Sequence, residues 1–377
     1  MSITIFSASI GNGHNEASHA LKEQFELQGE TVDVVDTFQC IHPLLHKLFL
    51  DSYLHILKRT PNLWGKMYKY GADYSWFLLM DYLGACFCEK LQTILTEQRT
   101  TIMVSTHPFV TAFLSKLKTK KNLQLPLYTI ITDLGLHPAY FRSEVNGYFT
   151  ASPYFSEFAE EYNIPSEQFF CTGIPIKQVP DVSLPRRSLR VKLALKPEKK
   201  TLLITGGGLG IGKFVEIVQS LEEIDEEIQI LCLTGRNEGM EKKLRKMCSK
   251  HTLHIIPFTK QFTEYLRASD VILSKAGGLT MSEALACETP ILIYQPVPGH
   301  EEENAQFLIE TGTAVKAETL PHVNRLLYQL FNDEHYYNYF IHNAKKIKKP
   351  NAARRIAELI KDLEATTEQS YDPQSLA

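Results

Sequence analysis

Short runs of apolar and β-branched residues recur along most of the chain and alternate with stretches of helical character. Runs of this length, bounded by turn residues, are typical of buried strands, and their alternation with helices predicts βαβ units. Parallel strands joined in this way need cover on both faces, so we expect an α/β protein with doubly wound parallel sheets. The predicted strands are Ile3–Ser7, Val32–Val35, Thr101–Val104 and Leu127–Ile131 in the first half, and Leu202–Thr205, Ile228–Leu233, Leu253–Ile256, Val271–Leu273 and Ile291–Ile293 in the second.

The chain is long enough for two domains, because 377 residues exceed what one hydrophobic core usually supports. A segment rich in proline and glycine separates the two sets of strands and suits a hinge. Ligands of open α/β sheets bind beyond the carboxyl ends of the strands, so we expect two Rossmann-like domains facing across a cleft. The predicted divisions are 1–175 for the first domain, 176–185 for the hinge, 186–345 for the second domain, 346–365 for a helix that packs back across both, and 366–377 for a disordered tail.

An insertion of about residues 42–97 separates the second and third predicted strands and is too long for a simple crossover. It contains both tryptophans, Trp64 and Trp76, beside many apolar, aromatic and basic residues. One interpretation is a helical hairpin that caps the sheet. The other is a surface for an acceptor or for the membrane interface, where tryptophan, tyrosine and lysine are favoured.

The overall composition excludes few functions. A formal net charge of −3 gives no strong field toward nucleic acid, and seven scattered cysteines are typical of reduced thiols in a cytosolic protein. The sequence has neither a secretory signal pattern nor an apolar run near the roughly 18 residues of a transmembrane helix. We therefore expect a cytoplasmic protein, which can still be peripheral on the inner face of the membrane.

A glycine loop, Gly11-Asn12-Gly13-His14, follows the first predicted strand. Glycines at a strand-to-helix turn allow close approach of another molecule, and the helix start offers free N–H groups. Near neutral pH the His14 imidazole could accept a proton from an acceptor hydroxyl. The alternative is a histidine that only caps the start of the helix.

A second glycine loop, residues 206–212, follows the first strand of the second half. The spacing from Gly207 to Gly212-Lys213 imitates a P-loop, but Phe214 stands where a magnesium-binding serine or threonine is required. A dinucleotide fingerprint is also missing. The loop is therefore predicted to cradle a diphosphate without being the P-loop of an NTPase.

Two further loops carry polar side chains after predicted strands. Gly277-Gly278 is followed by Thr280, the expected helix cap, and by Glu283, which we place in the first helical turn, where a carboxylate could accept two ribose hydroxyls. Glu301 and Asn304 follow a turn stiffened by proline and glycine and could bridge sugar hydroxyls. Helix capping is the alternative for Glu283, and a solvated helix start is the alternative for Glu301 and Asn304.

Taken in order, these loops resemble the monogalactosyldiacylglycerol synthase and processive diacylglycerol glucosyltransferase family. They are more distantly similar to the enzyme that adds GlcNAc to the lipid-linked peptidoglycan precursor. The similarity runs from about Ile3 to Leu330. The motifs that carry it are Gly11-x-Gly13-His14, Thr132-Asp133 with His137, Thr172-Gly173-Ile174-Pro175-Ile176, Thr205-Gly206-Gly207-Gly208, Gly277-Gly278-x-Thr280-x-Ser282-Glu283-Ala284 and Pro298-Gly299-x-Glu301-x-x-Asn304.

The resemblance implies a GT-B fold, a UDP-sugar donor, and inversion at the anomeric carbon without a cofactor or a tightly bound metal. Three residues depart from the family's common pattern, namely Tyr140, Lys177 and His300, and they bear on the sugar and acceptor more than on the fold. The residues implied for catalysis are His14, Asp133 and His137. The residues implied for donor binding are Gly13, Lys177, Gly207, Gly208, Phe258, Thr259, Gly278, Thr280, Glu283, His300, Glu301 and Asn304, with Phe258 and Thr259 beside uracil, Glu283 on the ribose, and His300 and Glu301 near the hexose.

We therefore predict an inverting hexosyltransferase that uses a UDP-hexose donor and a lipid hydroxyl acceptor, expected to be diacylglycerol or a glycolipid. Reversible contact with an anionic membrane surface is expected, and no nucleic-acid partner. A UDP-sugar 2-epimerase would use similar UDP contacts, but the large apolar insertion would then have no purpose. A non-catalytic UDP-sugar sensor is a third reading, against which His14 and Asp133 count.

The insertion yields a membrane-binding prediction. If its apolar face meets lipid, the protein binds vesicles reversibly, and anionic lipid strengthens binding by about 1 kcal/mol per basic residue near the surface. Replacing Trp64, Trp76 and Phe77 by serine should abolish vesicle binding in a flotation assay, while the melting temperature and UDP affinity stay near wild type. If the wild-type protein binds no vesicles of any composition, the predicted lipid contact is refuted.

Overall fold

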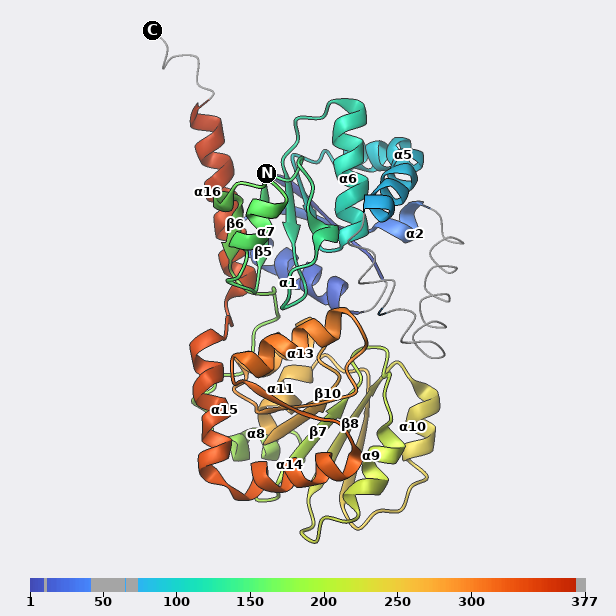
Figure 1. Ribbon diagram of the computed structural model, residues 1–377, viewed down its shortest axis with the longest axis vertical. Helices are drawn as coiled ribbons and strands as arrows, with labels where there is room; N and C mark the ends of the chain where they lie inside the picture. Colours follow the sequence, from blue (N-terminus) through green and yellow to red (C-terminus); the bar gives the residue numbers. More distant parts are fainter. Residues whose placement is uncertain (10–11, 42–64, 66–73, 371–377) are drawn as a thin grey trace.

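The computed structural model describes residues 1–9, 12–41, 65 and 74–370. The chain forms two lobes stacked end to end, the first from the N-terminal half together with the C-terminal helix, the second from the rest (Figure 1). Within the described residues each lobe contains one six-stranded sheet, and every strand pair is parallel. The predicted class, two doubly wound parallel-sheet domains, is thus confirmed.

The first domain has the strand order β2-β1-β3-β4-β5-β6. Its apolar strand residues meet helices on both faces, which gives two hydrophobic clusters, one on each side of the sheet. Its elements are β1 (Ser2–Ser7), α1 (Gly13–Leu27), β2 (Thr31–Asp36), α2 (Thr37–Ile41), α5 (Tyr74–Glu97), β3 (Ile102–Ser105), α6 (Pro108–Lys121), β4 (Leu127–Ile130), η1 (Pro138–Tyr140), β5 (Gly147–Thr150), α7 (Ser156–Glu161), η2 (Ser166–Gln168) and β6 (Phe169–Cys171).

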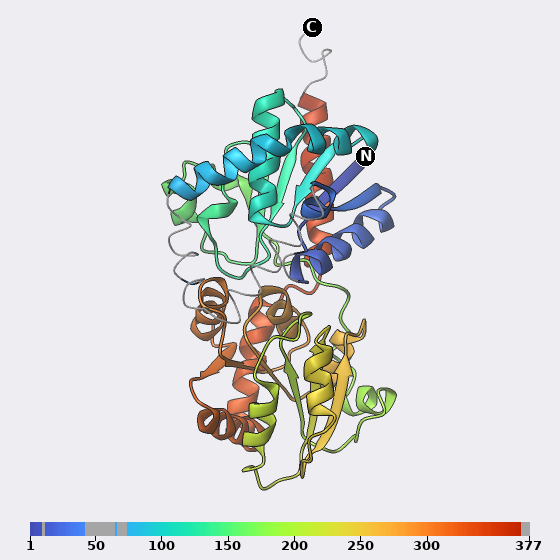
Figure 2. The ribbon, with the colours of Figure 1, turned by 90° about the vertical axis from the view of Figure 1, so that its right-hand side faces the viewer.

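The second domain has the strand order β12-β11-β10-β7-β8-β9, which is the classical order of a dinucleotide-binding fold read from its other edge. Helices again cover both faces of the sheet (Figure 2). Its elements are α8 (Arg186–Lys192), β7 (Thr201–Thr205), α9 (Phe214–Leu221), β8 (Gln229–Gly235), α10 (Glu238–Leu244), β9 (Thr252–Pro257), α11 (Phe262–Ala268), β10 (Val271–Ser274), α12 (Gly278–Ala286), β11 (Ile291–Tyr294), α13 (His300–Glu310), β12 (Ala314–Ala317), α14 (Leu320–Asn332) and α15 (Glu334–Ile347). The last helix, α16 (Ala352–Ser370), packs on the first domain.

All nine predicted strands are present, with ends that differ by one or two residues. The sequence pattern did not single out β5, β6 and β12, which are three or four residues long and lie toward one edge of their sheets. The segment 172–185 joins β6 to α8 without regular structure, in the region where the hinge was predicted.

The insertion is only partly described. Residues 42–64 and 66–73 lie outside the described chain, and so do the side chains of Trp76 and Phe77. From Tyr74 onward the segment is helix α5, which packs on α6 and buries Cys88, Leu91 and Leu95 in the core of the first domain. This half of the insertion therefore covers the sheet. In the described part of the chain, no helix combines the length and the apolar character needed to cross a bilayer.

Helix α16 returns the chain to the first domain (Figure 1). Ala353, Ile356, Ala357 and Ile360 lie fully or almost fully buried beside α1 and the first sheet. The helix continues to Ser370, five residues beyond the end that we predicted at Ala365, so the expected disorder of residues 366–370 is wrong. The first domain is completed by residues from the far end of the sequence.

We expect Ile356→Ala to destabilise the first domain by about 2–5 kcal/mol, because the deletion leaves a cavity in its core. Calorimetric unfolding should show a lower transition for that domain, with the transition of the second domain little changed. Ile309→Ala is the matched control, since Ile309 is 38% exposed. Equal effects of the two substitutions would contradict the assignment of α16 to the first core.

Candidate active site

A cavity of about 1040 Å³ lies between the two domains. Of the fifteen residues predicted for catalysis and donor binding, the cavity wall contains all but two, His137 and Asn304. The lining residues from that prediction are Gly13, His14, Asp133, Lys177, Gly207, Gly208, Phe258, Thr259, Gly278, Thr280, Glu283, His300 and Glu301.

Sheet topology explains why these loops meet. The strand order reverses between β1 and β3 in the first sheet and between β7 and β10 in the second. Loops that leave neighbouring strands at such a switch point diverge to opposite faces and open a crevice at the carboxyl edge. The His14 loop follows β1, and the loops of Gly207 and Gly278 follow β7 and β10, so the two crevices together form the cavity.

Gly278 sets how closely the domains approach. A Cβ atom at this position would lie 2.3 Å from the carbonyl oxygen of Thr132 in the first domain. Only glycine tolerates that contact without a backbone shift. The glycine predicted from the sequence as a ligand contact is thus also the point of backbone contact between the domains.

The ring of His14 is held by the loop that follows β3. Its Nδ1 lies 2.7 Å from the carbonyl oxygen of Thr106 and 2.9 Å from Oγ1 of Thr132. A carbonyl oxygen can only accept, so Nδ1 carries the proton and donates it. In the neutral ring Nε2 is then the nitrogen with the free lone pair, which is the form that a general base requires.

The surroundings keep this ring neutral. Burial lowers the pKa of His14, while the carboxylate of Asp133 opposes the shift and His300 adds to it. The ring of His107 lies edge-on at 4.6 Å between centroids, and burial lowers its pKa well below the usual range. Both imidazoles are therefore neutral at pH 7.

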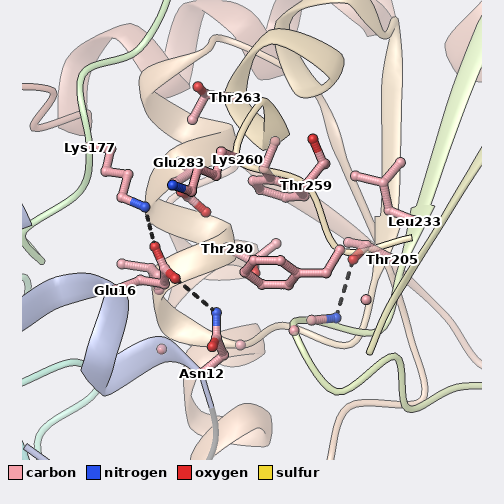
Figure 3. Close-up of a pocket in the computed structure, with 18 of the residues that line it drawn as sticks. Asn12, Glu16, Lys177, Thr205, Leu233, Thr259, Lys260, Thr263, Thr280 and Glu283 are labelled. Carbon is pink, nitrogen blue, oxygen red and sulfur yellow. Dashed lines mark hydrogen bonds and ion pairs between the residues drawn. The ribbon is translucent and has the colours of Figure 1, made fainter. Parts of the chain in front are cut away.

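Glu283 is buried in the cavity wall, beside an ion pair between Glu16 of α1 and Lys177 of the segment that joins the domains (Figure 3). Asn12 Nδ2 donates to Glu16 at 3.3 Å. Burial, reinforced by the charge of Glu16 and opposed by Lys177, raises the pKa of Glu283 to about 8. Perturbed carboxyl groups in a cleft are typical of functional sites.

A second ion pair lines the same cavity. Lys275 contacts Oε1 of Glu301, and the backbone N–H of Val297 donates to Oε2 of Glu301 at 2.8 Å. Glu301 is 1% exposed. The ammonium of Lys275 lies near the Gly207 loop, where a Cβ on Gly207 would be 4.0 Å from its Cε. The positively charged side chain of Lys275, which precedes Gly277 in the chain, thus lies close to the Gly207 loop.

Phe258 contributes an exposed aromatic ring to the cavity wall. The guanidinium of Arg236 lies 4.7 Å from the ring centroid of Phe258, a side chain that is 39% exposed. Thr259 Oγ1 accepts from the backbone N–H of Gln261 at 3.1 Å. An exposed ring in a cavity wall offers a stacking surface for a planar base.

Two details of α12 correct the sequence prediction. Gly277 is the N-cap, so Thr280 lies within the first turn of the helix and does not cap it. Glu283 lies in the second turn rather than the first. The helix therefore begins at Gly278, three residues before the start that a cap at Thr280 would give.

His137 and Asn304 are the two predicted site residues that do not line the cavity. His137 caps η1, where its Nδ1 accepts from the backbone N–H of Ala139 at 3.2 Å. Asn304 is fully buried at the domain interface. Gly11 of the first motif lies outside the described residues.

Other residues that line the cavity were not predicted as site residues, and they include Asn12, Glu16, Arg236 and Lys275. Asn12 is part of the first glycine loop, and Lys275 lies two residues before Gly277. Glu16 and Arg236 gave no signal, because charged residues one turn into a helix or after a strand are ordinary. In the described chain, no three His, Cys, Asp or Glu side chains are grouped so that they could hold a metal.

Residues 14–176 match the protein family described as monogalactosyldiacylglycerol (MGDG) synthase, and residues 201–360 match the glycosyltransferase family 28 C-terminal domain. A processive diacylglycerol beta-glucosyltransferase from Bacillus cereus is 30% identical over 318 residues, which are 83% of this chain and 81% of that protein. The chain belongs to this glycosyltransferase family. Membership confirms the resemblance on which the site prediction rested.

Solved structures of proteins with low sequence identity to this chain have the same fold. MurG of Acinetobacter baumannii superimposes with a TM-score of 0.60 at 17% identity, over 96% of this chain and 99% of that one. A co-structure of S. aureus MnaA with UDP gives 0.60 at 17%, over 95% of each chain. The predicted GT-B fold is confirmed.

The raised pKa of Glu283 makes stability depend on pH in a definite direction. Between about 4.5, the value of a free glutamate, and about 8 the folded protein keeps a proton that the unfolded chain releases. This contribution to stability is therefore complete at low pH and is lost as pH rises toward 8, by up to about 1.4 kcal/mol per pH unit. Glu283→Gln should flatten this part of the curve in urea unfolding without ligand. An unchanged slope would show that Glu283 titrates normally.

Proposed function

We propose that this protein transfers a hexose from a UDP-sugar to a hydroxyl of diacylglycerol or of a glycolipid, with inversion at the anomeric carbon, at the cytoplasmic face of the membrane. The observation that carries the proposal is the neutral His14, held through Nδ1 in a cavity whose opposite wall is suited to a nucleoside diphosphate. Family membership supports the reaction class and the lipid acceptor.

The second domain supplies the donor site. Uracil stacks on Phe258, and the ribose hydroxyls bond to Glu283. Both residues line the same cavity. The diphosphate lies against the Gly207-Gly208 loop, whose conformation is held by the hydrogen bond from the backbone N–H of Gly207 to Thr205 Oγ1 at 3.2 Å. Free N–H groups at the start of α12 add to the anion site.

Transfer is a single displacement. The acceptor oxygen attacks C1 of the hexose, the bond from C1 to the phosphate oxygen breaks, and UDP leaves with the electron pair. Nε2 of His14 takes the acceptor's proton as the new bond forms, and Asp133 stabilises the resulting imidazolium. One attack from the face opposite the leaving group inverts the configuration.

The departing diphosphate carries the charge that the site must offset. Lys177 and Lys275 line the cavity, each paired with a carboxylate, Glu16 and Glu301 respectively. Preorganised positive groups of this kind stabilise charge as it develops, together with the amides of the glycine loops. No step requires a resident cofactor or a tightly bound metal.

The test is transfer by the purified protein to diacylglycerol vesicles with labelled UDP-glucose, UDP-galactose and UDP-GlcNAc in turn. We expect a glycolipid from one of these donors, and NMR of its anomeric proton should show a configuration opposite to that of the donor. Retention would refute the single displacement. A sugar nucleotide epimerised without acceptor would favour the 2-epimerase, and donor binding without any product would favour a sensor.

Two substitutions should separate the acceptor and donor halves. His14→Ala is expected to lower turnover by about 10²–10⁴-fold with UDP affinity nearly intact, because only proton transfer is lost. Glu283→Ala should instead weaken UDP binding by about tenfold to a hundredfold, as expected when the hydrogen bonds between its carboxyl group and the ribose hydroxyls are lost. Turnover assays and calorimetric titration with UDP measure both. If His14→Ala also abolishes UDP binding, His14 is a donor-binding or structural residue.

A further inference from the structure

The side chain of Asn304, on α13 of the second domain, connects the two domains directly. It is 0% exposed. Its Oδ1 accepts from the backbone N–H groups of Leu134 at 2.7 Å and Gly135 at 3.3 Å, both in the first domain. Its Nδ2 donates to Oδ1 of Asp133 and to the carbonyl oxygen of Ala276, each at 3.1 Å.

These four bonds use the whole capacity of the amide. A carboxamide has two N–H donors and an oxygen with two lone pairs. Each is occupied by a protein partner, so Asn304 has no group left for a sugar hydroxyl. Its absence from the residues that line the cavity agrees with this count.

The partners lie on opposite sides of the site. Asp133 lines the cavity and acts on the pKa of His14, so it belongs to the acceptor side. Ala276 precedes the Gly277-Gly278 pair and has a φ of +71°, a left-handed conformation that costs free energy for any residue with a Cβ. A bond to its carbonyl oxygen helps to hold the loop in that conformation.

We propose that Asn304 is a positioning residue that couples closure of the two domains to the placement of Asp133 and of the Gly277-Gly278 loop. The inference rests on the proposed function, since it assigns a role in that reaction. Three of the four bonds, those to Leu134, Gly135 and Asp133, cross between the domains and form only when the domains are closed, whereas the bond to Ala276 lies within the second domain. Because most of the lost bonds hold the first domain, loss of the amide should lower turnover much more than donor affinity.

Asn304→Asp is the sharpest test, because it changes one NH₂ group to oxygen and keeps the shape. The new oxygen would face Asp133 Oδ1 and Ala276 O, where repulsion replaces two hydrogen bonds. We expect kcat to fall by about tenfold to a hundredfold. Affinities for UDP and for the UDP-hexose that wild type transfers, measured without acceptor, should stay close to wild type.

Asn324 provides a matched control within the second domain. It is 9% exposed, and its Nδ2 donates to the carbonyl oxygen of Ser220 at 2.8 Å and to Oε2 of Glu223 at 3.1 Å. Asn324→Asp therefore places a carboxylate against one backbone carbonyl and one carboxylate, as Asn304→Asp does. We expect a comparable loss of melting temperature in both variants but a loss of kcat only in Asn304→Asp.

Asn304→Ser serves if the aspartate variant does not fold, since it removes the amide without adding charge, and the same loss of kcat is expected. The proposal is overturned if either Asn304 variant loses UDP-hexose affinity while keeping UDP affinity, which would indicate a sugar contact. It is also overturned if kcat falls equally in Asn324→Asp. Absence of transfer by the wild type would instead refute the proposed function itself.

Discussion

The close approach of two backbones is the constraint on which the site depends. Gly278 lies against the carbonyl oxygen of Thr132, in a contact that any side chain at position 278 would prevent. Thr132 in turn contacts the ring of His14, and the next residue is Asp133. The position of His14, the base that we propose, relative to the glycine loops of the second domain is thus set by a contact between the domains. Neither domain alone presents the complete arrangement.

Charged side chains in the cavity between the domains are paired with one another. The cavity contains two ion pairs, Glu16 with Lys177 and Lys275 with Glu301, and the first joins α1 to the segment between the domains. Buried or half-buried lysines are costly without partners, so the carboxylates stabilise them in the free protein. A diphosphate offers a better partner for the same ammonium groups. Binding would then exchange one set of ion pairs for another, and the protonated Glu283 avoids adding a further negative charge to the free cavity.

Both sheets and most of the loops that line the cavity could be predicted from the sequence, because glycine loops and buried strands are local signals. Gly207, Gly278 and His14 follow strands directly, and parallel strands bring their carboxyl ends to one edge. The predicted cap of α12 at Thr280 is wrong, because the helix begins after Gly277 and glycine, like threonine, is favoured at the N-cap position. The short strands β5, β6 and β12 gave too few residues for a periodic pattern.

What the sequence could not show is which polar residue faces the ligand and which holds another residue in place. Glu301 and Asn304 lie one turn apart on α13, and the motif that carries them invites the same role for both. In the structure Glu301 reaches the cavity wall, whereas Asn304 turns to the domain interface. The difference arises from long-range contacts, since the partners of Asn304 lie about Asp133 and Ala276, far away in sequence. A shared motif therefore places both residues near the cavity, but the packing between the domains determines that Glu301 lines the cavity and Asn304 does not.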